Sequence, residues 1–304
     1  MTRVLMPFPA DAALASTMNQ AMQARIAPVA WRHFPDGESL VTLEDSLAGA
    51  DVAILASLRH ADALALPLRF AARTAREFGA RSVGLIAPYL GYMRQDTRFH
   101  RGEAVSTPLF AQFLEEAFDW LVTVDPHLHR VERLQSLYRI PTVHVSATPA
   151  VARWIAETVP DAVLIGPDSE SEQWVADIAA LSGMPYQVLA KERHGDYDVR
   201  VSLPDPAAVA GRTPVLIDDI VSSGHTILET LAHLRRLSLP SPLLVAIHPV
   251  FAGDAYARLQ EAGLARIVST DTISHPSNAI ALGADLAAAA STLMTASTDS
   301  PEDP

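Results

Sequence analysis

The chain has 304 residues, of which 49% are hydrophobic and 19% are charged, a balance that is normal for a globular protein with a full core and that excludes a disordered chain. Its formal net charge of −12 would on average repel a nucleic-acid backbone or an anionic membrane, so we expect neither as a partner. The absence of cysteine excludes disulfides and thiolate metal sites and is compatible with a reducing cytoplasm, the location we expect.

The two ends of the chain carry no sign of a membrane segment. The N-terminal stretch MTRVLMPFPADAALAS has one arginine and an apolar run broken by proline and Asp11, which indicates a first strand rather than a secretory signal. The longest apolar tract, residues 279–294, is alanine-rich, shorter than a bilayer requires and interrupted by Asp285. The last residues are polar, acidic and contain proline, so we expect a disordered tail at 291–304.

Apolar runs that suit buried strands recur along the chain. They lie at residues 4–8, 29–34, 52–57, 83–88, 121–124, 143–145, 163–165, 187–190, 215–217, 244–247 and 267–269. Helical spacing occurs between many of them, at residues 61–78, 107–118, 148–158, 170–181, 227–237 and 254–262. This alternation predicts an α/β fold with largely parallel sheets. A change near residues 138–145 divides the chain into two similar halves, which we place at 1–142 and 143–290.

Three of the apolar runs end in acidic residues. Asp125 ends the first, Asp168 the second, and the pair Asp218 and Asp219 the third. Ligands of parallel α/β sheets bind beyond the carboxyl ends of the strands, so these carboxylates predict one divalent, phosphate-rich site, with Mg2+ favoured by hard oxygen ligands. For any one of these residues considered alone, capping a helix N-terminus is the commoner role.

Residues 214–227, PVLIDDIVSSGHTI, combine the Asp218–Asp219 pair with a loop of small residues and the start of a helical pattern. Backbone N–H groups and hydroxyls at a helix N-terminus bind phosphate. Carboxylates would repel phosphate, so the pair must serve sugar hydroxyls or magnesium. The stretch therefore predicts a site for a phosphorylated sugar.

Residues 87–106, APYLGYMRQDTRFHRGEAVS, form a polar segment after a strand end. Arg94, Arg98 and Arg101 accompany Gln95 and Asp96, a group that could pair with polyphosphate and hydrogen-bond a base. The alternative is a solvated basic loop.

Together these segments resemble the ribose-phosphate diphosphokinases, the phosphoribosyl pyrophosphate synthetases. PVLIDDIVSSGHT is similar to their ribose 5-phosphate loop and also to the phosphate loop of type I phosphoribosyltransferases, whereas PYLGYMRQDTRF resembles a nucleotide-binding segment that the transferases lack. HFPDGES resembles the family's FxDGE loop, DPHLH its DxH metal and ATP motif, GPD its PD segment, and KER the KxR of its catalytic loop. The motifs occur in family order over roughly residues 4–275 and look closest to the shorter archaeal-type form.

The resemblance implies two tandem phosphoribosyltransferase-like domains, the first carrying the ATP loops and the second the ribose 5-phosphate and catalytic loops. It implies a homodimer or higher homo-oligomer, because the FxDGE loop of the family reaches ATP bound by a neighbouring subunit. The implied ATP-binding residues are Phe34, Asp36, Gly37, Glu38, Arg94, Gln95, Asp96 and His127. The implied ribose 5-phosphate residues are Arg193, Asp218, Asp219, Ser222, Ser223, Gly224, His225 and Thr226. Lys191 and Arg193 inherit the catalytic role, and His127 and Asp168 the magnesium role.

The sequence departs from the family pattern at two places and leaves two alternatives open. After Asp168, where the family usually has a glycine pair, this chain has Ser169, Glu170, Ser171 and Glu172. His225 stands where the family's phosphate loop usually has a small residue or glycine. A phosphoribosyltransferase would use the same phosphate loop but gives no reason for FPDGE or RQD. A non-catalytic regulatory homologue is weakly favoured by Glu170 and Glu172 and opposed by the retention of Lys191, Arg193 and Asp219.

Overall fold

The chain forms two compact units. The first contains Met1–Val145, Thr272–Ser274 and Leu282–Pro304, and the second contains Ser146–Asp271 and His275–Ala281. The computed structural model describes residues 2–43, 46–128, 130–131, 133–189, 191–193, 199–201, 209–235 and 239–296. In this described part, no helix is long and apolar enough to cross a membrane.

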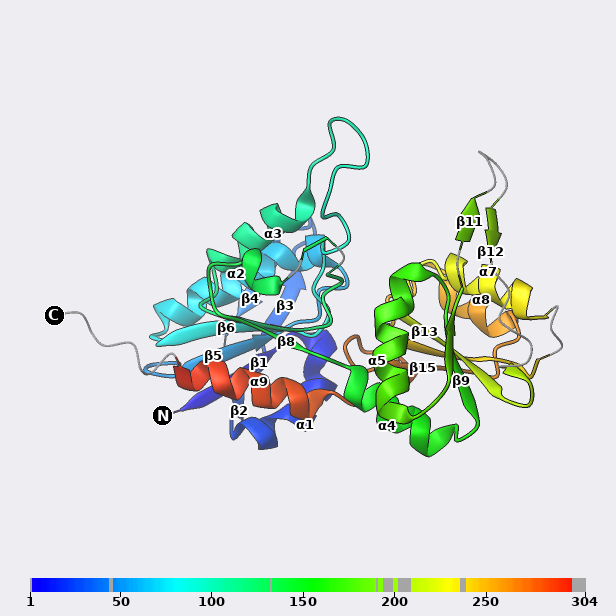
Figure 1. The fold of residues 1–304 in the computed structure, drawn as a ribbon. Coiled ribbons are helices and arrows are strands. Elements are labelled where there is room, and N and C mark those ends of the chain that lie inside the picture. The colour runs from blue at the N-terminus through cyan, green and yellow to red at the C-terminus, as the bar shows by residue number, and fades with distance from the viewer. Residues whose placement is uncertain are drawn as a thin grey trace. The chain divides into compact units, whose positions relative to one another are not determined.

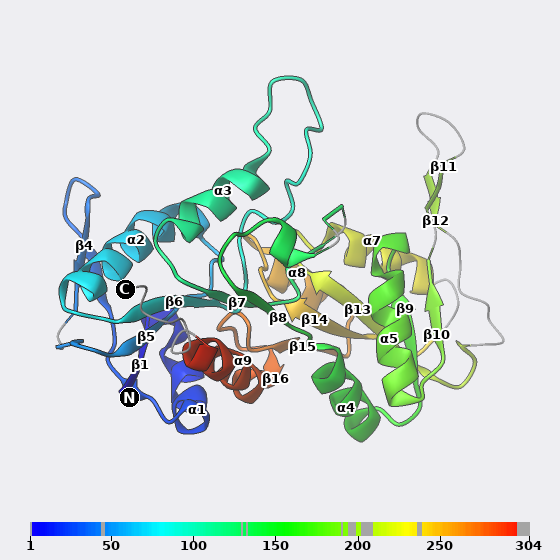
Figure 2. The ribbon, with the colours of Figure 1, turned by 60° about the vertical axis from the view of Figure 1, so that its left-hand side comes forward.

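The first unit is built on a parallel six-stranded sheet with the order β2-β1-β5-β6-β7-β8. Its strands are β1 (Arg3–Pro7), β2 (Arg25–Ile26), β5 (Asp51–Leu55), β6 (Ser82–Ala87), β7 (Leu121–Val124) and β8 (Thr142–Val145). Its helices are α1 (Ala12–Met22), α2 (Ala61–Glu77), α3 (Ser106–Glu115) and α9 (Gly283–Ala296), with short 3-10 turns η1 (Pro9–Asp11) and η2 (Leu134–Ser136). Helices α2 and α3 cover one face and α1 and α9 the other (Figures 1 and 2). Every residue of β5, β6 and β7 is therefore buried, as apolar strands covered on both faces require.

The second unit repeats this plan with the sheet order β10-β9-β13-β14-β15-β16, again all parallel. Its strands are β9 (Ala162–Gly166), β10 (Tyr186–Val188), β13 (Thr213–Ile220), β14 (Leu243–His248), β15 (Arg266–Thr270) and β16 (Asn278–Ile280). Its helices are α4 (Thr148–Thr158), α5 (Glu172–Ser182), α7 (His225–Leu234) and α8 (Ala255–Glu261), preceded at α5 by the 3-10 turn η3 (Ser169–Ser171). In both units the third strand of the order is followed directly by a helix.

Each unit also carries one antiparallel hairpin inserted before that third strand. In the first unit it joins β3 (Ala30–His33) to β4 (Ser39–Thr42), and in the second it joins β11 (Lys191–Arg193) to β12 (Val199–Val201). The hairpin of the first unit holds the FPDGE motif and that of the second unit holds the KER motif. In each unit, a predicted functional loop is therefore inserted at the same point of the fold.

The predicted α/β class with largely parallel sheets is confirmed, but three expected boundaries differ. The strand expected at 215–217 continues as β13 through Asp218 and Asp219, because β14 offers it backbone partners as far as His248. Residues 291–296, expected in a tail, form the end of α9, whose buried apolar side chains pack towards α1 and the strands β6 to β8. The tail residues from 297 onwards lie outside the described residues. The segment from 282 also belongs to the first unit rather than to the C-terminal domain expected at 143–290.

Candidate active site

The turn that follows β7 holds the DPH motif in an unusual backbone conformation. Asp125 has φ 31° and His127 has φ 46°, in the left-handed region that residues other than glycine rarely adopt. The N–H of His127 donates to the carbonyl of Asp125 at 2.9 Å, and Nε2 of His144 on β8 lies 2.7 Å from Oδ1 of the buried Asp125. Such backbone strain persists only where surrounding contacts fix it, and it gathers at functional sites.

The predicted nucleotide segment meets the DPH turn through an ion pair. Arg130 donates from Nη1 to Oδ1 of Asp96 at 2.9 Å, and the Asp96 side chain is only 4% exposed. Next to it, Ser106 at the start of α3 donates to Oε1 of Gln95 at 2.7 Å. Arg94 is exposed. The structure therefore brings the loops after β6 and β7 together, and Arg130 is a linking residue that the sequence analysis missed.

The FPDGE motif forms the tip of the β3–β4 hairpin. The N–H of Phe34 donates to the carbonyl of Glu38 at 2.8 Å, the N–H of Gly37 returns to the carbonyl of Phe34 at 2.9 Å, and Asp36 Oδ1 accepts from the N–H of Glu38 at 3.2 Å. Gly37 has φ 92°, which only glycine adopts readily. Phe34 is 40% exposed beneath the guanidinium of Arg32. The hairpin thus presents its motif to solvent.

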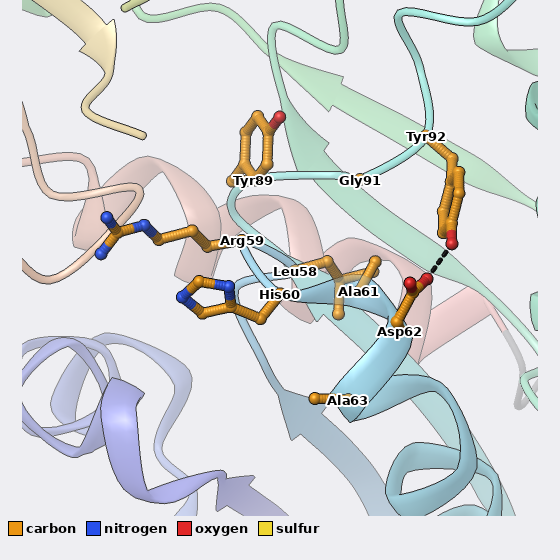
Figure 3. A pocket seen from close by; sticks show the side chains of 9 residues that line it. All are labelled: Leu58, Arg59, His60, Ala61, Asp62, Ala63, Tyr89, Gly91 and Tyr92. Atoms are coloured by element: carbon orange, nitrogen blue, oxygen red, sulfur yellow. Dashed lines mark hydrogen bonds between the residues drawn. The ribbon is translucent and has the colours of Figure 1, made fainter. Parts of the chain in front are cut away.

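A cavity of about 450 Å³ opens at the carboxyl ends of β5 and β6, between the loops that follow these two strands. Arg59 and His60 extend to one side of it, and Tyr92 points to Asp62 at the start of α2 (Figure 3). The hydrogen bond from Tyr92 to this carboxylate raises the pKa of the tyrosine. Tyr89, Gly91 and Tyr92, which line the cavity, belong to the predicted nucleotide segment at residues 87–106.

In the second unit, Asp168 caps the turn that leads into α5. Its Oδ1 accepts from the N–H groups of Glu170 at 3.1 Å and Ser171 at 3.3 Å, and the Ser171 hydroxyl donates back to the Asp168 carbonyl at 2.6 Å. Asp168 therefore has the helix-capping role that the sequence analysis gave as the common alternative for any one of the acidic residues at the strand ends. Glu170 and Glu172 are both exposed beside it, so the two residues that depart from the family pattern face solvent.

The phosphate-loop motif lies between β13 and α7. Asp218 and Asp219 are half-buried near the end of β13, Gly224 is the N-cap of α7 with φ 71°, and α7 begins at His225. His225 is exposed, and its Nε2 lies 3.1 Å from Oε1 of Glu229 one turn further along the helix. The loop therefore sits at a helix N-terminus, the arrangement expected of a phosphate site.

The carboxylates of the second unit end neighbouring strands. β13 pairs with β9 with Leu216 opposite Ile165, so Asp168 and the Asp218–Asp219 pair belong to the same edge of the sheet. No three acidic or histidine side chains of the described residues cluster as a complete metal site. Magnesium commonly uses one or two carboxylates with waters and substrate phosphates, so these hard oxygens fit it without a closed cage. His127 offers an imidazole nitrogen in the first unit.

Lys191 and Arg193 belong to strand β11, and their side chains lie outside the described residues. The structure therefore leaves their predicted catalytic role untested.

Comparisons with known proteins agree over nearly the whole chain. The family model of the N-terminal domain of ribose phosphate pyrophosphokinase matches residues 4–117, and that of the phosphoribosyl transferase domain matches residues 145–283. A ribose-phosphate pyrophosphokinase of Methanopyrus kandleri is 32% identical over 282 residues, covering 92% of this chain and 96% of the relative. One of Halobacterium salinarum is 33% identical over 264 residues, covering 86% and 90%. The crystal structure of phosphoribosylpyrophosphate synthetase from Mycobacterium smegmatis superposes with a TM-score of 0.83 at 24% identity, covering 99% of this chain and all of that one, and shows a shared fold.

Proposed function

The chain belongs to the ribose-phosphate pyrophosphokinase family, and from this membership we propose that it transfers pyrophosphate from Mg-ATP to the anomeric hydroxyl of ribose 5-phosphate. The products are phosphoribosyl pyrophosphate and AMP. The observation that carries the proposal is the second unit's loop between β13 and α7, which joins two carboxylates to a helix N-terminus. A phosphorylated sugar is the ligand whose two ends match these two features.

Ribose 5-phosphate binds along this loop. Ser222, Ser223, Gly224 and Thr226 hold the 5-phosphate with backbone N–H groups and hydroxyls, supported by the positive end of the α7 dipole. Asp218 and Asp219 accept hydrogen bonds from the ribose hydroxyls. The carboxylates are kept away from the phosphate because they lie on the strand and the phosphate donors lie after it.

Magnesium is the proposed cofactor. Asp168 in the second unit and His127 in the first unit are the proposed magnesium ligands, and bound magnesium would neutralise phosphate charge on ATP. The exposed Glu170 and Glu172 lie close in sequence to Asp168, so cation binding there also offsets their repulsion of a polyphosphate. Calorimetric titration of MgCl2 into the protein with ribose 5-phosphate should show binding that Asp168→Asn weakens, independently of turnover.

The nucleotide binds to the first unit. Gln95 and Asp96 are held by Ser106 and Arg130, which leaves the exposed Arg94 free to extend towards the base or phosphates of ATP. In the chemical step the anomeric hydroxyl releases its proton to solvent and its oxygen attacks the β-phosphorus in line. The bond from that phosphorus to the α,β-bridging oxygen breaks, and AMP leaves with the bridging oxygen. Lys191 and Arg193 offset the negative charge that builds up on the transferred group.

One assay tests the activity. AMP should appear from Mg-ATP only when ribose 5-phosphate is present, with phosphoribosyl pyrophosphate formed in equal amount. AMP release that does not depend on ribose 5-phosphate would contradict the proposal. Absence of AMP release despite binding of both substrates would also contradict it and would favour a non-catalytic regulatory homologue.

We also propose that the site is shared between subunits of a homo-oligomer, because the hairpin presents Phe34, Asp36 and Glu38 to solvent. Inactive Asp36→Ala and Arg193→Ala chains should regain part of their activity when mixed, since a shared site can then draw both intact residues from different chains. Two affinity tags, one on each variant chain, would verify that mixed oligomers have formed. If these mixed oligomers stay inactive, the result would argue against an active site shared between subunits.

A further inference from the structure

Three successive carbonyl groups of the phosphate loop accept hydrogen bonds, two from the segment between β14 and α8 and one from α8. The N–H of Phe251 donates to the Val221 carbonyl at 2.8 Å, and the N–H of Ala252 donates to the Ser222 carbonyl at 3.0 Å. The third bond is different, because it comes from a side chain: Nη2 of Arg258 on α8 donates to the Ser223 carbonyl at 3.0 Å.

These three bonds fix the direction of the loop's donors. In a trans peptide the carbonyl of one residue and the N–H of the next point to opposite sides. With the three carbonyls held by the 251–258 segment, the N–H groups of Ser222, Ser223 and Gly224 are directed away from that segment. Successive N–H groups directed to one side form the concave arrangement that binds anions.

The Ser223–Gly224 peptide is the one most able to turn over. Gly224 has φ 71°, and glycine populates negative φ about as readily, so this peptide can rotate without a side-chain clash. A larger residue would not fit easily at position 224, since a Cβ there would lie 3.1–3.4 Å from the Leu259 side chain. Arg258 bonds the carbonyl of this peptide, and Asp254 Oδ1 in turn holds Nε of Arg258 at 3.0 Å.

We infer that Arg258 is a positioning residue for ribose 5-phosphate: by holding the Ser223 carbonyl it keeps the Gly224 N–H directed at the 5-phosphate. The inference rests on the proposed function for the identity of the ligand. The guanidinium acts through the loop and makes no contact with substrate.

Three variants test it. Arg258→Met removes the donor and keeps the length of the side chain, Arg258→Lys keeps a donor, and Arg235→Met is the matched control, because Arg235 is another arginine of this unit that donates to a backbone carbonyl, that of Ala262 at 2.6 Å. Arg258→Met should raise the KM and the calorimetric Kd for ribose 5-phosphate about tenfold, the effect of losing one hydrogen bond to a charged group. The KM for ATP should stay within about twofold, Arg258→Lys should recover most of the affinity, and Arg235→Met should leave it unchanged.

Two further measurements separate positioning from a general effect of charge or folding. The affinity ratio between the unaltered protein and Arg258→Met should persist at high salt, whereas the effect of a distant point charge would fade. The amide resonance of Gly224 should shift when ribose 5-phosphate is added to the unaltered protein and shift less in Arg258→Met.

Unchanged ribose 5-phosphate affinity in Arg258→Met, equal loss in Arg258→Lys, or a ratio that disappears with salt would each overturn the inference. The binding measurements do not depend on turnover. Ribose 5-phosphate binding that depends on Arg258 in a protein that forms no AMP would therefore support the inference while the proposed activity fails.

Discussion

The buried carboxyl group of Asp11 should make the free energy of unfolding depend on pH. This residue ends η1, its side chain is buried, and its Oδ2 accepts from the N–H of Ser57 at 3.1 Å. Burial raises the pKa of Asp11 from 3.8 to about 6, although the hydrogen bond from Ser57 opposes the rise. The folded chain therefore keeps the proton to higher pH than the unfolded chain does, so Asp11 makes the free energy of unfolding fall as pH rises from about 4 to about 6.

By this linkage the ionised Asp11 lowers the free energy of unfolding by about 3 kcal/mol at neutral pH. In Asp11→Asn the amide oxygen can still accept from Ser57 but carries no charge. The variant should match the unaltered protein near pH 4 and exceed its free energy of unfolding by about 2–3 kcal/mol near pH 7.5.

Urea titrations followed by tryptophan fluorescence at both pH values measure this difference. Asp285→Asn, a change at an exposed carboxylate in the first turn of α9, serves as the control for loss of one negative charge. If Asp11→Asn differs from the unaltered protein by the same amount at both pH values, or is less stable at neutral pH, the reasoning from burial is wrong.

Three other changes have expected outcomes. Lys191→Ala should lower kcat a hundredfold or more with ribose 5-phosphate binding nearly intact, because its charge acts mainly in the transition state; unaltered turnover would remove it from the mechanism. Arg130→Met should raise the KM for ATP more than that for ribose 5-phosphate, since it frees Asp96; equal effects would point to misfolding. Gly84→Ala should lower the melting temperature by several degrees, because its Cβ would lie 1.9 Å from the Trp120 ring; an unshifted melting curve would show that the ring can move.

Local sequence pattern was sufficient to predict much of the fold. The helix predicted at 148–158 is α4, Thr148–Thr158, where a proline in the first turn adds a start signal to the helical spacing. The two-residue strand β2 was missed because two residues show no alternation. Helix α1 was also missed, although its buried residues Leu14, Ala15, Met18 and Met22 have helical spacing. The local residue pattern does not show which strand will pair with a segment or how far the pairing extends. The end of β13, which depends on its pairing with β14, was therefore misplaced.

The family motifs predicted which strand ends carry polar residues but not how those residues are held. Asp96 and Arg130 are separated by 34 residues and Asp125 and His144 by 19, and no periodicity links such pairs. Arg258 illustrates the same limit. It lies on a surface helix with ordinary composition, and only the fold places its guanidinium on the Ser223 carbonyl.

Helix α9 also constrains how the chain can fold while it is being made. The first unit lacks this helix until residues 283–296 have been synthesised, although its sheet is complete once β8 has emerged. At 5–20 residues per second, the ribosome needs roughly 7–30 s to cover the intervening stretch. During that interval the face of the sheet that α9 will cover is exposed, because the residues of the second unit are synthesised before α9. Translation that stops before α9 would therefore damage the half of the protein that was made first.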